Sequence, residues 1–184
     1  MNKTAWILIA VVAVLILGGI MSYNNLVSMN ENVNGKWSQI ENQLQRRADL
    51  IPNLVNTVKG YAAHEQAAIQ AVADARAKLA GAQGPAAKAQ ANADMNNALS
   101  RLLVVAENYP NLKADKNFRA LMDELSGTEN RIAVARKDYN DAVQNYNVKI
   151  RSFPTNIFAG MMGFGPKEYF KAEEEAKQVP KVQF

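Results

Sequence analysis

The feature that most constrains this chain is an uninterrupted apolar segment near its N-terminus. Every residue from Ala5 to Met21 is apolar or glycine. As a helix, these 17 residues would extend about 26 Å, slightly less than a bilayer hydrocarbon core of about 30 Å. Trp6 and Tyr23 bracket the segment, where amphipathic rings suit the two membrane interfaces. The sequence therefore predicts a transmembrane anchor in residues 1–22 that contacts the lipid bilayer through residues 5–21.

A cleaved signal peptide is the competing interpretation, because Lys3 followed by an apolar stretch also fits that design. Residues 17–22 make a poor cleavage site, so we favour an anchor that is retained and crosses the membrane once. The first positive residue after the anchor is Lys36. The positive-inside rule then favours, on a single lysine, a cytoplasmic N-terminus with the remaining chain outside.

The next segment is predicted to continue the same helix, because nothing between Met21 and Tyr23 breaks one. Apolar residues then recur at spacings of three and four, which is typical of a buried helix face. These positions are Leu26, Val33, Trp37, Ile40, Leu44, Ile51, Leu54, Val58 and Tyr61. Pro52 interrupts the pattern, because proline lacks a backbone donor and clashes with the carbonyl four residues earlier. We expect a kink near residues 48–52, or a restart with Asp49 as N-cap.

An alanine-rich stretch follows, with seventeen alanines in residues 62–106. One strong break, in residues 81–85, divides it into the two arms of a helical hairpin. Alanine favours helix but offers little area to bury, so the arms must pack closely or associate with other chains. Tyr109 and Pro110 end the second arm.

The clearest periodicity lies in the last long helix, where large residues recur every seven positions. They are Phe118, Leu125, Ile132, Tyr139, Tyr146 and Phe153, and Leu121, Thr128, Ala135 and Ala142 follow the first four by three positions. This pattern predicts coiled-coil-like packing. Pro154 stops the helix, a glycine-rich apolar loop continues through Gly165, and Pro166 opens a short helix to about Lys177.

The predicted fold is therefore all-α, with an N-terminal transmembrane helix that continues into a long antiparallel bundle. The bundle is expected to contain four to five helices and to occupy residues 23–177. Residues 178–184 are expected to form a loose tail.

Residues that could support catalysis are scarce. Cysteine is absent, which excludes disulfides, thiolate metal ligands and a cysteine nucleophile. The one histidine, His64, lacks the second histidine of a zincin motif, since position 68 is Ala68. No nucleophile elbow, P-loop or Rossmann fingerprint is present. We expect no enzyme, no cofactor, no metal and no small-molecule substrate.

The net charge of +4 does not indicate a nucleic-acid partner, because lysines and arginines are scattered among acids. Arg46 and Arg47 are more distinctive, since Arg47 lies on the apolar stripe. Arg47 could snorkel or pair with an acid, such as Asp49 or one on a facing helix. Alternatively, the arginine pair docks an anionic lipid or a partner's acid. His64 is expected in a surface or hydrogen-bonded role, ahead of a pH sensor or ligand.

A second candidate surface follows the last long helix. Its residues, Ile157, Phe158, Met161, Met162 and Phe164, are too apolar for an ordinary solvent-exposed loop. We favour a role in capping the end of the bundle. The alternatives are that these side chains dip into a membrane or contact another subunit.

Several of these stretches together resemble the LemA family of bacterial proteins. The central matches are Tyr23–Val27, Val33, Trp37–Ile40, Leu44–Val55, Lys59–Tyr61 and His64–Glu65, and the C-terminal ones are Tyr146–Asn147, Ile150, Phe153–Pro154 and Phe164–Gly165. The resemblance implies a single-pass protein of the bacterial inner membrane with an antiparallel helical bundle and no established catalytic residues. It assigns no role to Arg46, Arg47, Asp49 or Pro52, although all four lie in the matched motif.

A magnetosome protein of the same family is tied to forming internal membranes, so the resemblance implies, by analogy, a membrane-organising role. The leading hypothesis is a membrane-anchored, non-enzymatic scaffold that forms homo-oligomers. The alternative is an envelope adaptor or sensor. It would bind a membrane protease or another envelope protein through Arg46, Arg47 and the apolar loop.

Overall fold

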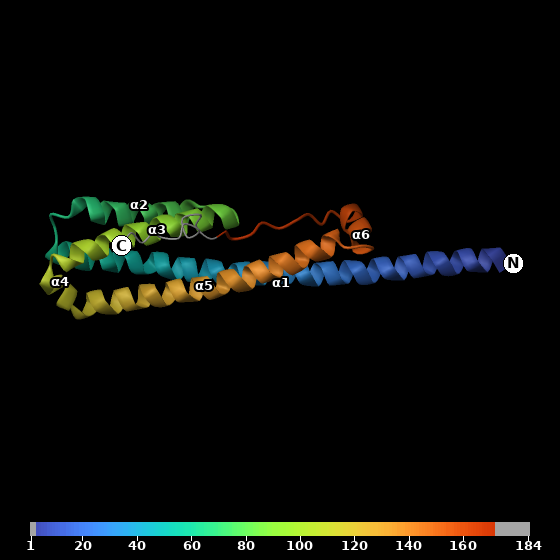
Figure 1. The fold of residues 1–184 in the computed structure, drawn as a ribbon, viewed down its shortest axis with the longest axis horizontal. Coiled ribbons are helices and arrows are strands. Elements are labelled where there is room, and N and C mark those ends of the chain that lie inside the picture. Colours follow the sequence, from blue (N-terminus) through green and yellow to red (C-terminus); the bar gives the residue numbers. More distant parts are fainter. Residues whose placement is uncertain (1–2, 172–184) are drawn as a thin grey trace, which may run out of the picture. The chain divides into compact units, whose positions relative to one another are not determined.

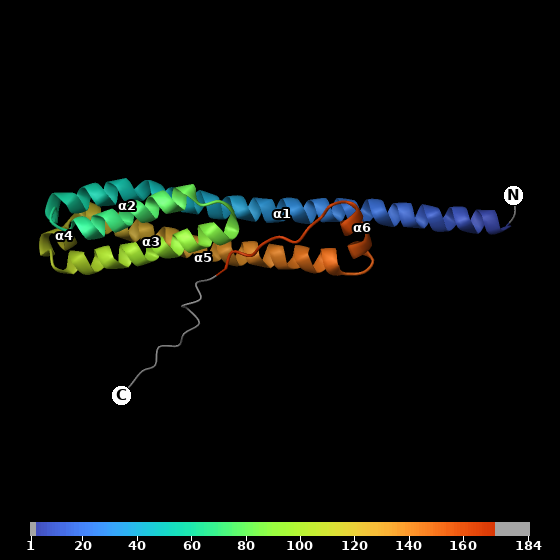
Figure 2. The same ribbon diagram turned by 90° about the horizontal axis from the view of Figure 1, so that it is seen from above.

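The computed structural model describes residues 3–171, which form helices and connecting segments (Figures 1 and 2). The helices are α1 (Lys3–Tyr61), α2 (Gln66–Gly81), α3 (Gly84–Glu107), α4 (Pro110–Ala114), α5 (Lys116–Arg151) and α6 (Thr155–Met161). The prediction of an all-α chain with a long apolar N-terminal helix that packs with others in a bundle is confirmed. The predicted tail, residues 178–184, lies outside the described residues.

The helices form two compact units. Within the described residues, unit 1 comprises residues 3–37 and Asp138–Glu168, and unit 2 comprises Ser38–Lys137 and residues 169–171. Helices α1 and α5 each contribute to both units, whereas α2, α3 and α4 belong to unit 2 and α6 belongs to unit 1.

Helix α1 begins at Lys3 and continues through Met21 and Tyr23 without interruption, as predicted. Its N-terminal part is apolar and largely uncovered: every large apolar side chain from Trp6 to Met21 is more than half exposed. This part of α1 is long and apolar enough to cross a membrane.

Helix α1 also runs through Pro52, so the predicted restart at Asp49 is wrong. Proline lacks the N–H group that would bond to the carbonyl of Ala48. Arg76 of α2 replaces that donor, because its Nε donates to the Ala48 carbonyl oxygen over 2.9 Å. A side chain from a neighbouring helix therefore satisfies the acceptor that Pro52 leaves unpaired, and the helix continues.

The predicted stripe on α1 forms much of the core. Leu26, Ile40, Leu54 and Val58 are fully buried. Tyr61, the last residue of α1, is 44% exposed, and its hydroxyl donates to Oδ2 of Asp115 over 3.0 Å. The periodicity therefore identified the buried face of α1 and failed at its C-terminal end.

Helices α2 and α3 form the predicted hairpin and lie side by side (Figures 1 and 2). The break occurs where the sequence placed it, with Gly84 at a φ of +77° and Pro85 in the first turn of α3. Buried alanines face the core from both arms, among them Ala75, Ala91 and Ala98. Small side chains allow the close approach that the composition of this stretch predicted.

Helix α5 carries the seven-residue repeat, and five of its large residues are buried: Phe118, Leu125, Ile132, Tyr139 and Tyr146. Asp115 caps the start of this helix by accepting a hydrogen bond from the Phe118 backbone N–H over 2.8 Å. That bond is the main reason why the pKa of Asp115 lies below its ordinary value. The prediction that Phe153, the sixth member of the repeat, packs with the others is wrong, because α5 ends at Arg151 and Phe153 is 81% exposed.

Two predictions for the region after α5 are also wrong. Residues 155–161 form helix α6 where a loop was expected, and residues 164–171 are not helical although a helix was expected from Pro166. Residues 172–177, the remainder of that predicted helix, lie outside the described residues.

Side chains of α5 explain why the chain does not form a helix after Pro166. Asn147 Oδ1 accepts from the Lys167 N–H over 2.8 Å, and Asn147 Nδ2 donates to the Lys167 carbonyl over 2.9 Å. The Tyr139 hydroxyl donates to the Glu168 carbonyl over 2.8 Å. Burial, with a smaller contribution from Glu168, raises the pKa of Tyr139 to about 12, so this donor stays protonated. These bonds replace the ones a helix would have made.

Candidate functional site

The most unusual buried group in unit 2 is the guanidinium of Arg47. The apolar spacing of α1 turns this position inward between Leu44 and Ile51, and Arg47 is only 3% exposed. A buried charge of this kind is costly unless it is paired and hydrogen-bonded. The residues that surround Arg47 therefore decide what it does.

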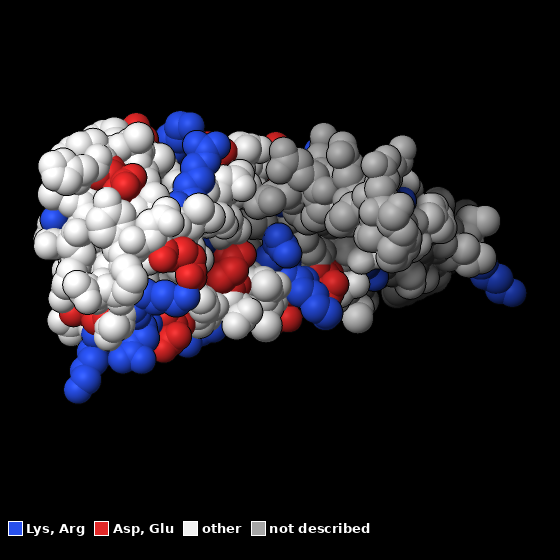
Figure 3. All heavy atoms as spheres, turned by 60° about the vertical axis from the view of Figure 1, so that its left-hand side comes forward, with Lys and Arg blue, Asp and Glu red and all other residues white. Residues whose placement is uncertain are grey.

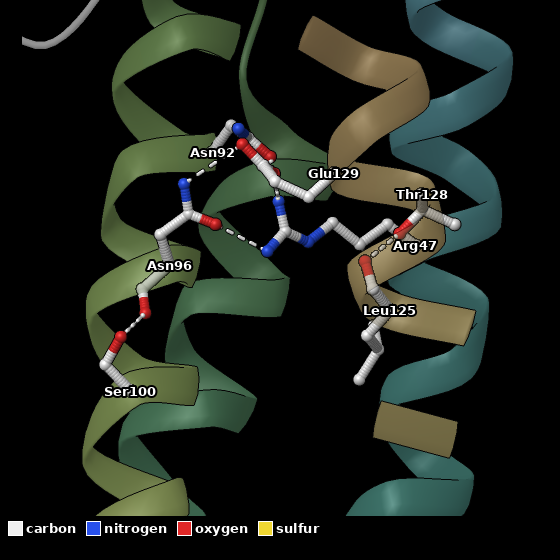
Figure 4. A network of polar contacts seen from close by, with 7 residues as sticks. All are labelled: Arg47, Asn92, Asn96, Ser100, Leu125, Thr128 and Glu129. Carbon is white, nitrogen blue, oxygen red and sulfur yellow. Dashed lines mark hydrogen bonds and ion pairs between the residues drawn. The ribbon is translucent and has the colours of Figure 1, made fainter. Parts of the chain in front are cut away.

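Three polar side chains from two other helices surround the guanidinium (Figure 4). Nη1 of Arg47 donates to Oδ1 of Asn92 over 2.7 Å and forms an ion pair with Oε2 of Glu129. Nη2 donates to Oδ1 of Asn96 over 2.5 Å. Nδ2 of Asn96 in turn reaches Oε1 of Glu129 over 3.4 Å. We call these four residues the Arg47 network.

The Arg47 network connects three helices through the guanidinium group of Arg47. Asn92 and Asn96 lie one turn apart on α3, Glu129 lies on α5, and Arg47 lies on α1. Burial lowers the pKa of Arg47, while the charge and hydrogen bond of Glu129 oppose that shift. Among the described residues, Nε of Arg47 is the atom of this guanidinium that finds no acceptor. The cation is thus largely satisfied within the chain.

Arg46 behaves differently, although it is the next residue in the sequence. Its side chain is 59% exposed, and Nη2 lies 2.7 Å from Oε1 of Glu124 on α5. The same carboxylate oxygen lies 2.8 Å from Nη2 of Arg131. Both arginines therefore contact acids of a facing helix within unit 2. This arrangement agrees with the interpretation that the arginines pair with acids of the same chain.

The other candidate site residues of unit 2, Asp49, Pro52 and His64, are exposed and do not join the Arg47 network. Asp49 accepts from Gln45 Nε2 over 2.9 Å, which is a contact within one turn of α1. Pro52 lies on the exposed face of α1. His64 is exposed in the turn between α1 and α2.

An open groove of about 290 Å³ lies beside the Arg47 network, between α3 and α5. Its walls include Leu99, Leu103 and Met122, and Arg47 and Glu129 contribute to its lining. No group of three or more His, Cys, Asp or Glu residues that could hold a metal ion occurs within residues 3–171. On the face in Figure 3, lysines and arginines are interspersed with aspartates and glutamates, so that face does not gather one sign of charge.

The apolar candidates lie in unit 1, against the N-terminal part of α1. The ring of Phe158 on α6 covers Gly19, since its Cε1 lies 3.3 Å from where a Cβ at Gly19 would stand. The ring of Phe164 meets that of Tyr23 edge-on, with centroids 5.9 Å apart. Met161 remains 81% exposed and Met162 40% exposed. Phe158 and Phe164 thus pack on α1, whereas Met161, Met162 and Ile157, which is 52% exposed, remain exposed.

Sequence reasoning did not single out Asn92, Asn96, Glu129 or Arg76. Two asparagines four positions apart in an alanine-rich helix are a detectable signal, because buried amides require partners. For Glu129 and Arg76 the sequence contains no comparable signal. Their roles depend on which helices become neighbours.

A sequence profile of the LemA family matches residues 36–184. The chain belongs to the LemA family. Magnetosome protein MamQ 2 of Paramagnetospirillum magneticum is 34% identical, over 88% of this chain and 68% of that protein. Magnetosome protein MamQ of Magnetospirillum gryphiswaldense is 32% identical with the same coverage, and Protein LemA of Metamycoplasma hominis is 24% identical over 82% of this chain and 69% of its own length.

The family assignment confirms the resemblance inferred from the sequence motifs. Arg46, Arg47, Asp49 and Pro52 all fall within the matched region of this LemA family member. The apolar segment of α1 precedes that region.

Proposed function

We propose that this LemA family member is a single-pass membrane protein without catalytic activity that associates with copies of itself and thereby organises a membrane or an envelope assembly. The observation that carries the proposal is the uncovered apolar part of α1, from Trp6 to Met21. Removal of one such side chain from water contributes about 1.5–3 kcal/mol, so a dozen of them strongly favour a bilayer.

The non-enzymatic part of the proposal is supported by how the polar groups are used. Arg47, the buried cation of unit 2, is engaged by Asn92, Asn96 and Glu129. Such a network stabilises contacts between helices, and its one carboxylate, Glu129, is engaged by Arg47 and Asn96. The membrane-organising part is supported by relatives whose names place them in the magnetosome.

Self-association is supported by an apolar strip on α3. Leu103 is 43% exposed and Val104 is 68% exposed, and Leu103 also lines the groove between α3 and α5. A two-fold symmetric dimer brings the same patch of both copies together.

Cysteine crosslinking tests this arrangement, because the chain contains no cysteine of its own. We expect the full-length Val104→Cys variant in detergent to form a covalent dimer with a short thiol-reactive crosslinker, since a residue near the two-fold axis meets its own copy. The Ala67→Cys variant is the matched control, because Ala67 is an exposed small residue on α2. It should stay monomeric under the same treatment.

Equal crosslinking at both positions would contradict the α3 interface, and a strictly monomeric protein by light scattering would contradict self-association altogether. A monomer that recovers one envelope protein, and loses it when Arg46 is changed to Glu, would favour the adaptor alternative instead.

The orientation that we propose places the N-terminus in the cytoplasm and the bundle outside, because Lys3 precedes the anchor and the next positive residue is Lys36. We fuse, after Phe184, a reporter that functions only outside the cytoplasm, and we expect this fusion protein to be active. A second reporter that is active only in the cytoplasm serves as the control. Activity of the second reporter alone would reverse the orientation and leave the anchor unaffected.

A further inference from the structure

We infer that helix α6 is a second membrane contact, held in the lipid leaflet from which α1 emerges, with lipid acyl chains filling the groove between α1 and α6. This inference rests on the proposed anchor. If α1 spans the bilayer, whatever packs on its apolar segment also lies at membrane depth. Helix α6 packs there, because Phe158 covers Gly19.

The position of this contact along α1 sets its depth. Gly19 lies two residues before Met21, the last residue of the apolar segment, which corresponds to about 3 Å along a helix axis. Tyr23 lies just beyond the segment and contacts Phe164. Both contacts therefore fall at the boundary between the acyl chains and the headgroups, where short amphipathic helices lie.

The exposed side chains of α6 are those of a lipid-facing element. Met161 is 81% exposed and Ile157 52% exposed, and they lie one turn apart on the same face of α6. Phe153, just before α6, is 81% exposed. Exposure of these apolar side chains to water costs free energy, whereas contact with the acyl chains of the leaflet does not.

A groove of about 430 Å³ runs between the two helices. One wall is formed by α1, from Val12 to Tyr23, and the other by Phe158, Met161 and Met162. Val12 lies nine residues before Met21, about 14 Å deeper along the helix. A groove that begins at the interface and extends inward along an apolar wall fits an acyl chain.

The charges near α6 favour the same occupant. No acidic residue lies between Asp141 and Glu168, whereas Lys149, Arg151 and Lys167 do. Lys149 and Arg151 are in the last turn of α5, directly before the turn that leads into α6. Basic residues beside an interfacial helix attract anionic headgroups. The surface thus combines an apolar face with cationic flanks.

Site-directed fluorescence tests the inference in the full-length protein. Single cysteines at Met161, Leu15 and Gln70 are each labelled with an environment-sensitive fluorophore. The protein is then reconstituted into vesicles of phosphatidylethanolamine and phosphatidylglycerol, some with brominated acyl chains. We expect severalfold stronger quenching by bromine at Met161 than at Gln70, which is exposed on α2. Leu15, in the anchor, should be quenched as well.

The three positions separate the possible failures. Quenching at Leu15 with none at Met161 would overturn the inference and leave the anchor intact. No quenching at Leu15 would overturn the anchor, and the inference with it.

A pair of glycine variants excludes insertion driven by the fluorophore alone. A Cβ at Gly19 would crowd Phe158, whereas a Cβ at Gly18 would meet nothing within 4 Å. Both variants are made in the Met161→Cys protein, and bromine quenching of the fluorophore at position 161 is measured. Gly19→Leu should displace α6 and change this quenching at least twofold, whereas Gly18→Leu should leave it unchanged. Unchanged quenching in both would show that α1 does not hold α6, and would overturn the inference.

Discussion

Replacement of Arg47 by alanine is expected to lower the free energy of unfolding by about 3 kcal/mol or more, whereas replacement of Arg46 should lower it by less than about 1 kcal/mol. The two arginines are neighbours in the sequence and both pair with an acid of α5. They differ in burial, because Arg47 is 3% exposed and Arg46 is 59% exposed. Burial therefore decides which ion pair stabilises the fold.

The large cost at Arg47 comes from the partners that alanine would leave behind. Asn92 is 6% exposed, so its Oδ1 would lose its donor in a place that water scarcely reaches. Glu129 would keep a charge beside the same site without its cation. Each unsatisfied buried polar group costs about 1–3 kcal/mol, and the long alkyl stem of Arg47 is lost as well.

Chemical denaturation of the full-length chain in detergent, followed by the helical circular dichroism signal, measures both effects. Arg47→Lys is the sharper test, because lysine keeps the charge but cannot reach Asn92, Asn96 and Glu129 with one planar fork. It should fall between the native protein and Arg47→Ala. Equal losses at positions 46 and 47 would refute the structural role assigned to the Arg47 network.

The anomaly at Arg47 could be recognised from the sequence, but its partner could not. Strict spacing on α1 places a charge among apolar residues, and a buried charge must be paired, so an acid on a facing helix was a valid expectation. Which acid it is depends on the register between α1 and α5, and Glu129 has no feature that distinguishes it from Glu124 in the sequence. Periodicity determines the face of a helix, and packing determines its register.

Pro52 is a second case in which the sequence alone does not predict the packing between helices. Local rules predict that proline interrupts a helix, because the carbonyl four residues earlier loses its donor. The interruption is avoided because Arg76, on a different helix, donates to Ala48. Likewise, the glycine-rich stretch around Gly160 was predicted as a loop, yet Thr155–Met161 is helical where it can pack on Gly19 of α1. Tertiary contacts override local propensity in both places.

The second large effect is expected at Tyr146, in unit 1. Tyr146 and Phe153 occupy equivalent positions of one seven-residue repeat, so the sequence treats them alike. Tyr146 is 1% exposed, whereas Phe153 is 81% exposed because α5 ends before it. Replacement of Tyr146 by alanine removes a fully buried ring and leaves a cavity, which should lower the free energy of unfolding by about 3 kcal/mol.

Phe153→Ala is the matched control, since it removes an aromatic ring from the same repeat and should change the free energy of unfolding by less than about 0.5 kcal/mol. The measurement is the same denaturation of the full-length chain in detergent. A loss at Phe153 comparable to that at Tyr146 would mean that the repeat continues past Arg151 and that Phe153 is covered. If the control is neutral, the exposed ring of Phe153 does not support the fold and is available to the lipid beside α6.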